Sequence, residues 1–271
     1  STTAQTTSPT VAIGPDGSIF LAWSDKSGGD SEIYVRQWHD GAWQEVGSQS
    51  ATGGGISNNS GSSESPSVAI GTNGIIYVAW EDDSSGNKEI YVRRFINDVW
   101  SEINGSASKG GISNTSGDSR APSLYLGPED LPYIAWEEVG ASNSQIYVRR
   151  WNANTWGEVG TGSASGGGIS NSSGDSTLPA LVVKDNGDVF VTWADKSGGD
   201  TEIYVRYFVG SSWTELGTGS ASGGGISDNT GTSRNPDLAL AGDGTVYVAW
   251  SDDDLRPDPH PVHDGPRRPA A

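Results

Sequence analysis

The 271-residue chain has no cysteine, no methionine and only three histidines: His39, His260 and His263. The lack of cysteine excludes disulfides, thiol nucleophiles and thiolate metal sites. The scarcity of histidine also excludes a serine triad, a three-histidine zinc site and an HExxH metalloprotease site. No run of 18 apolar residues occurs, so we expect no membrane span.

Positive charge is also scarce, with 16 Lys and Arg against 34 Asp and Glu and a net charge of −18. We expect no nucleic-acid partner, because such affinity comes mainly from Lys and Arg that neutralise phosphates. Acidity, freedom from cysteine and many Ser, Thr, Gly and Asn residues instead favour an extracellular or surface-displayed bacterial protein.

What the sequence does contain is a tandem repeat of 56–57 residues. One tryptophan recurs in step, as Trp23, Trp80, Trp136, Trp193 and Trp250. A proline opens each unit, as Pro9, Pro66, Pro122, Pro179 and Pro236. Four units also carry Ile-Tyr-Val-Arg, which ends at Arg36, Arg93, Arg149 and Arg206. Self-similarity at a fixed period indicates a repeat architecture.

Each unit contains four short runs rich in Val, Ile, Tyr and Trp, bounded by turn residues, which predicts four strands. The second run is apolar on both faces, so its sheet must be covered on both sides. Four-stranded blades around an axis satisfy this requirement, and we predict an all-β propeller of four complete blades and a partial fifth. A linear array of small β-sandwiches is the alternative.

The repeat defines the domain boundaries. Units begin near residues 9, 66, 122, 179 and 236, and we assign residues 1–254 to the propeller. Residues 255–271 hold five of the 13 prolines, so they cannot supply the missing strands of the fifth unit. We expect a disordered Pro/Arg-rich tail there, and further blades or self-association to close the ring.

Two stretches resemble known families. Trp23 to Val35 (WSDKSGGDSEIYV) resembles the blade hairpin of bacterial TolB-type and sialidase-like propellers, and Ile146 to Gly160 is similar to blades of seven-bladed fucose-binding lectins. The lectin resemblance implies sugars bound between blades. The sialidase Asp-box is not matched, because Lys26 stands where its Asp would be.

In alternating strands, the hairpin between strands two and three and the Gly-rich connection to the next unit emerge on one rim. We therefore propose sugar or polar-ligand contacts from Asp30, Ser57, Asn58, Asn114, Asp118, Asn171, Asp175, Asp200 and Asp228. Plain turn chemistry is the alternative, since Gly, Asn, Asp and Ser all favour turns. Calcium is a second alternative, although neither loop matches a known calcium motif.

The repeated arginines predict structural Arg–carboxylate clamps within each blade, because a guanidinium pairs bidentately with carboxylates. The predicted pairs are Arg36–Asp25, Arg93–Asp82, Arg149–Glu138 and Arg206–Asp195. Capture of the carboxylate of an acidic sugar is the alternative.

The favoured function is carbohydrate binding at repeated rim sites, because near-identical units make multivalent sites more readily than one catalytic pocket. No catalytic residue, metal or cofactor is assigned. One alternative is a sialidase-like glycoside hydrolase, which a non-repeated Arg/Tyr/Glu cluster would favour; Tyr125, Tyr207, Arg120 and Arg234 are the hints. The other alternative is a purely structural or protein-interaction module.

Overall fold

The computed structural model describes residues 5–253, and the described chain is built from antiparallel strands with one 3-10 turn, η1 (Pro128–Asp130). Unit one forms β1 (Thr6–Ile13), β2 (Ile19–Asp25), β3 (Glu32–His39) and β4 (Ala42–Glu45). Unit two forms β5 (Ser63–Ile70), β6 (Ile76–Asp82), β7 (Glu89–Ile96) and β8 (Val99–Glu102). Unit three forms β9 (Ser119–Leu126), β10 (Pro132–Val139), β11 (Ser144–Trp151) and β12 (Trp156–Glu158). Unit four forms β13 (Ser176–Val183), β14 (Val189–Asp195), β15 (Glu202–Val209) and β16 (Ser212–Glu215), and unit five forms β17 (Ser233–Leu240) and β18 (Val246–Asp252).

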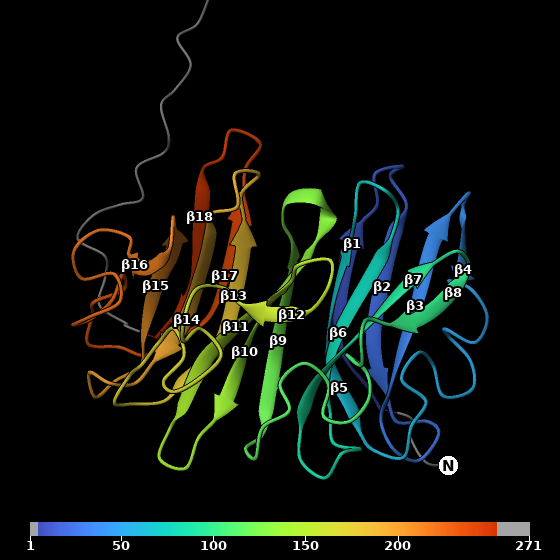
Figure 1. Cartoon of the computed structure of the whole chain (residues 1–271), viewed down its shortest axis with the longest axis horizontal. Coiled ribbons are helices and arrows are strands. Elements are labelled where there is room, and N and C mark those ends of the chain that lie inside the picture. The colour runs from blue at the N-terminus through green and yellow to red at the C-terminus, as the bar shows by residue number, and fades with distance from the viewer. Residues whose placement is uncertain (1–4, 254–271) are drawn as a thin grey trace, which may run out of the picture.

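The strands of each complete unit form one four-stranded sheet in chain order, and β17 and β18 form a two-stranded sheet. The sheets stand side by side, from blue to red in Figure 1, as the blades of a propeller do. The predicted all-β class and the four strands per complete unit are therefore confirmed. The predicted tail, residues 255–271, lies outside the described residues.

The core lies between successive sheets, because the second strands are apolar on both faces. Trp80 and Trp136 are 1% exposed. Phe20 of unit one packs in one cluster with Val68 of unit two, and Tyr77 of unit two packs with Leu124 of unit three. Burial of apolar side chains between neighbouring units, rather than within a single unit, thus stabilises the repeat.

The first strands surround a common axis. The residue before each repeated proline has a positive φ, at Ser8, Ser65, Ala121, Leu178 and Asn235. The strand register shifts at each of these places, which is the mark of a β-bulge, and a proline is tolerated there because no ladder N–H is needed. These five dipeptides line an axial pocket of about 390 Å³.

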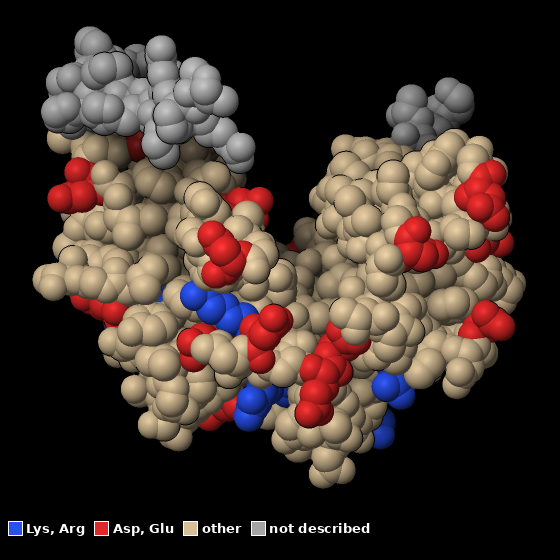
Figure 2. All heavy atoms as spheres, turned by 90° about the horizontal axis from the view of Figure 1, so that it is seen from above, with Lys and Arg blue, Asp and Glu red and all other residues tan. Residues whose placement is uncertain are grey.

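The described arc is open. Val11 is 62% exposed on β1, whereas its counterparts Val68 and Leu124 are 8% and 6% exposed against the preceding unit. At the other end Tyr247 is 59% exposed, whereas Tyr77 is 4% exposed. A gap separates the two sides of the molecule in Figure 2. Among residues 5–253 there is no helix long and apolar enough to cross a membrane.

Candidate functional site

The Gly-rich loops (46–62, 103–118, 159–175 and 216–232) fold back onto the third strand of their own unit. In unit two, the Ile112 N–H donates to the Ile90 carbonyl over 2.8 Å. Gly111 precedes this contact at a φ of 61°, and a Cβ there would be 2.5 Å from Cδ1 of Tyr91. Glycine is therefore required by both the backbone conformation and the close approach.

A buried side chain at the start of the third strand, a glutamate in units one, two and four, anchors each loop. Glu89 is 1% exposed and accepts hydrogen bonds from the Ser113 hydroxyl and, over 2.9 Å, from the Thr115 N–H. Burial raises the pKa of Glu89 above its usual value, against the effect of these hydrogen bonds. Unit three has Gln145 in this place, with equivalent bonds from Ser170 and Ser172.

The acid that follows the repeated tryptophan joins each loop to the next unit. Asp82 of unit two accepts hydrogen bonds from Trp80 Nε1 at 2.9 Å, from Ser63 at 2.8 Å and from Asn59 Nδ2 at 2.6 Å. Asn59 also donates its backbone N–H to Glu32 of unit one. The loops on this rim are thus held in place by buried polar contacts from two units.

The predicted Arg–carboxylate clamps are wrong. Arg93 lies opposite Val78 in the sheet, four positions from Asp82, a separation of about 13 Å along a strand. Among residues 5–253, no ion pair joins Arg36 to Asp25, Arg93 to Asp82, Arg149 to Glu138, or Arg206 to Asp195.

The arginines instead reach the preceding unit. Arg93 Nη1 donates to the carbonyl of Ile56 over 2.6 Å, and Arg206 Nη1 donates to that of Ile169 over 2.7 Å. Arg149 makes the same bond to Ile112. The repeated arginine is therefore an inter-unit bond to a Gly-rich loop, which the sequence pattern alone did not distinguish from an intra-unit clamp.

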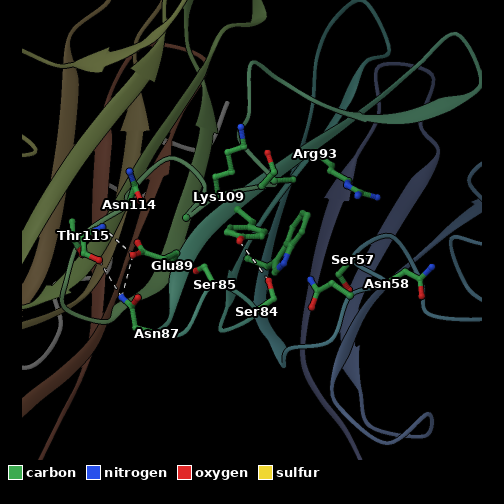
Figure 3. A pocket seen from close by; sticks show the side chains of 16 residues that line it. Ser57, Asn58, Ser84, Ser85, Asn87, Glu89, Arg93, Lys109, Asn114 and Thr115 are labelled. Carbon is green, nitrogen blue, oxygen red and sulfur yellow. Dashed lines mark hydrogen bonds between the residues drawn. The ribbon is translucent and has the colours of Figure 1, made fainter.

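A polar pocket of about 570 Å³ opens on this rim between units one and two. Its lining comes from the loop of unit one (Ser57, Asn58), from the hairpin after β6, and from the loop of unit two (Lys109, Asn114). Figure 3 shows these groups around one space, with Ser84, Ser85 and Asn87 from the hairpin. Trp80 and Tyr91 also line it but are almost fully buried, so they offer little stacking surface.

Unit four has a second pocket at the matching place, of about 340 Å³. Asn171 and Ser172 correspond to Asn58 and Asn59, and Ser197 corresponds to Ser84. The same arrangement of loop and hairpin therefore forms a pocket at two equivalent places in the repeat.

The structure brings only some of the proposed ligand residues together. Ser57, Asn58 and Asn114 line the first pocket and Asn171 the second. Ser57 is buried, and its hydroxyl is used by Glu32 and by the Ile33 N–H.

The proposed aspartates lie outside both pockets. Asp118 and Asp175 accept bonds from the N–H groups of Lys88 and Ser144, so they hold hairpins in place. Asp30 and Asp200 are partly exposed in the hairpins of units one and four, and Asp228 is exposed in the loop of unit four.

Sequence reasoning missed the hairpin side of the pocket. Asn87 Nδ2 donates to the carbonyls of Thr115 and Gly117, and Asn143 makes the equivalent bonds to Ser172 and Gly174. The signal was present, because Asn87 and Asn143 share a repeat column with Asp30 and Asp200.

Units two and three carry Glu81 and Glu137 where the second strands of the other units have Ser or Ala, and unit two carries Lys88, just before its third strand, where the other units have Ser or Thr. Lys88 Nζ lies 2.7 Å from Glu81 and 2.9 Å from Glu64. Burial opposes protonation of Lys88, but hydrogen bonds to Glu81 and Glu64 raise its pKa above the usual value. Glu81 also accepts the backbone N–H of Ala121, in the bulge of unit three, over 3.0 Å.

Glu137 occupies the position of Glu81 in unit three, where it lies opposite Arg120 in the sheet. Its hydrogen-bond donors are the Ser144 hydroxyl at 3.0 Å and the Leu178 backbone. Burial raises its pKa above the usual value. Arg120 forms its ion pair with Asp118. In the described part of the chain, no group of three or more His, Cys, Asp and Glu is arranged to hold a metal ion.

No family model matches the chain, and no curated protein does. Among solved structures, it is similar to an ulvan lyase of a polysaccharide lyase family, with a TM-score of 0.61 and 13% identity over 89% of this chain and 61% of that one. It is similar to an endo-arabinase from Bacteroides thetaiotaomicron, with a TM-score of 0.53 and 14% identity over 90% and 88% of the two chains. It is also similar to a Hadza microbial sialidase, with a TM-score of 0.55 and 14% identity over 90% of this chain and 52% of that one.

These likenesses concern the fold. The expected likeness to sialidases holds at that level. The likeness to TolB-type propellers and to seven-bladed lectins stays a prediction from the sequence. The chain spans less than two thirds of the lyase and sialidase chains.

Proposed function

We propose that the chain binds carbohydrate through repeated sites on the rim that carries the Gly-rich loops. The observation that supports this most directly is the recurrence of one polar pocket at equivalent places in units two and four. A fold built of near-identical units gains avidity from such sites even when each is weak.

The chemistry of the pocket suits a neutral, hydroxyl-rich ligand. Asn58 and Asn114 are exposed, and each amide offers two donors and one acceptor. The Ser85 hydroxyl adds a group that either donates or accepts, whereas the Ser84 hydroxyl already donates to Asp82 and is left only as an acceptor. The acids beneath are buried and already bonded, so they hold the rim rather than contact the ligand.

The solved structures with similar folds support the ligand class. Three of them are an ulvan lyase bound to a glucuronate–rhamnose sulfate, an endo-arabinase and a sialidase. Sugar recognition is therefore compatible with this arrangement of sheets. A carbohydrate ligand also fits our proposed placement of the protein outside the cell or at its surface.

The test is a broad glycan array, followed by calorimetry of each glycan that binds. Asn114→Gly removes the amide and still accommodates the φ of 47° at this position, so we expect at least a tenfold loss of affinity at one site. Asn104→Gly is the matched control: Asn104 has a φ of 53° in the same loop, lies outside both pockets, and should leave binding unchanged. If the folded protein binds no glycan on the array, the proposal is refuted.

The array should be run with calcium and with a chelator. Binding that survives chelation supports direct recognition by amides and hydroxyls. Loss of binding under chelation would instead assign the hairpin aspartates Asp30 and Asp200 to a metal site, the calcium alternative predicted from the loop composition.

A glycoside hydrolase is the second candidate, because Glu81 and Glu137 break the repeat. The Glu81 carboxylate accepts a hydrogen bond from Lys88, whereas Glu137 is half-buried and has no bonded cation, so the two acids have different environments, as the two acids of a glycosidase do. If this candidate is right, Glu137→Gln abolishes release of reducing ends from a polysaccharide that binds. Glu129→Gln, at an exposed residue in η1, is the control that should retain it. If the wild type binds a polysaccharide but does not cleave it, the hydrolase candidate is refuted and carbohydrate binding remains as the proposed function.

A further inference from the structure

Among residues 5–253, one edge of the last sheet has no paired strand. In the four complete sheets the second strand is bonded on both sides, as β6 is to β5 and β7. β18 pairs with β17, and no other described strand pairs with it. An open strand edge presents backbone N–H and C=O groups ready to pair with another strand.

The surface beside this edge is apolar where other units bury it. Trp250 is 38% exposed against 1% for Trp80. In the loop that follows unit four, Leu216 and Ile226 are 47% and 36% exposed. Their counterparts Val46 and Ile56 in the loop of unit one are 3% and 2% exposed, because the third and fourth strands of unit two cover them.

At each of the three interfaces between complete units, the third and fourth strands also donate two hydrogen bonds to the loop that they cover. Trp100 Nε1 donates to the Val46 carbonyl over 2.8 Å, and the arginine of the third strand donates to Ile56. Trp156 repeats the tryptophan bond to Ile103 at 3.1 Å, and Trp213 repeats it to Val159 at 2.7 Å. The next acceptors in this series are the carbonyls of Leu216 and Ile226, and the described residues include no tryptophan or arginine bonded to either.

We propose that the free edge of β18 and the adjoining loop of unit four dock a two-stranded β-hairpin, presented by a second polypeptide, that has the third- and fourth-strand sequence of this repeat. The first strand of the hairpin would extend the sheet beyond β18 and place its arginine at Ile226. The second strand would place its tryptophan at Leu216. The inference is independent of sugar binding.

A hairpin fits better than the other occupants. The places of the first and second strands are already filled by β17 and β18, so a complete unit would collide with them. A single strand would supply the arginine but leave Leu216 uncovered, because the tryptophan belongs to the fourth strand. The hairpin repeats an interface that the protein forms three times, with the same ladder, apolar cover and two donors.

The test uses the full chain and a fluorescent synthetic peptide of residues 88–103, which contains Arg93 and Trp100. We expect saturable one-to-one binding by anisotropy and slowed amide exchange along β18. The control peptide carries Arg93→Ala and Trp100→Ala, and we expect it to bind at least tenfold more weakly. No binding, or equal binding of both peptides, would overturn the proposal.

Variants of the chain locate the site and test the rival occupant. Leu216→Lys, at the exposed loop residue that the tryptophan of the hairpin would cover, should abolish peptide binding, whereas Val11→Lys at the opposite end should not. Light scattering of the wild-type chain alone tests a second copy docked through β1. A concentration-dependent dimer that both Val11→Lys and Leu216→Lys dissociate would assign this surface to that copy and overturn the hairpin.

Discussion

The contact between each Gly-rich loop and the third strand of the same unit can be tested at two glycines of one loop. Gly166 and Gly168 have φ values of 58° and 60°, so alanine is strained to the same extent at both. They differ in their surroundings. Nothing lies within 4 Å of a Cβ at Gly166, whereas a Cβ at Gly168 would overlap the carbonyl of Ile146 and lie 2.5 Å from Cδ1 of Tyr147.

The difference sets the expected magnitudes. Gly166→Ala costs only the left-handed conformation, about 1 kcal/mol. Gly168→Ala costs the same, plus about 1–3 kcal/mol of overpacking. It also disturbs the 2.8 Å bond from the Ile169 N–H to the Ile146 carbonyl, worth about 1 kcal/mol. We therefore expect a loss of about 3–5 kcal/mol for Gly168→Ala.

Urea unfolding followed by tryptophan fluorescence measures both free energies, since Trp136 and Trp193 lie buried in sheets on either side of this loop. Both variants carry the same backbone strain, so the difference between their free energies of unfolding measures the contact with the third strand. Losses that agree within about 0.5 kcal/mol would show that the loop does not rest on the third strand as described, and would remove the basis for a rigid rim.

Three further outcomes follow. Glu89 has a raised pKa in the folded state, so the stability of the wild type falls as pH rises from 4.5 through that pKa. Glu89→Gln should therefore be more stable than the wild type at pH 7 and equally stable well below pH 4.5. Gln145→Glu should change the stability in the opposite direction over the same pH series. Trp156→Phe loses its 3.1 Å bond to a backbone carbonyl and should cost about 1–2 kcal/mol in urea unfolding, whereas Trp43→Phe, at an indole that is 44% exposed and has no acceptor among residues 5–253, should cost less than about 0.5. Lys109→Gly relieves a φ of 52° and should raise the melting temperature while weakening only anionic glycans in calorimetry, and equal loss of neutral ones would contradict this.

The sequence was sufficient for what lies within a unit. The second strand, exemplified by Trp80, is apolar on both faces and therefore requires a sheet covered on both sides, and its content of Val, Ile, Tyr and Trp between turn residues predicts a strand. The partner of Arg93 was out of reach, because the hairpin pattern brings Asp82 close in sequence while the actual acceptor is a carbonyl of the preceding unit. Asn87 was missed for a similar reason: its role depends on the carbonyls of a loop that starts beyond β8.

The repeat and its exceptions have different consequences for function. Residues that recur in every complete unit, such as Arg93, are used by the contacts between units, and a site that depends on them would recur too. Asymmetric chemistry must therefore come from positions that differ. Lys109 replaces the glycine of the other loops, and Glu81, Lys88 and Glu137 replace Ser, Thr or Ala. These side chains all belong to units two and three, so a neutral ligand should bind both pockets, whereas selectivity for charge, or catalysis, would reside in the middle of the arc.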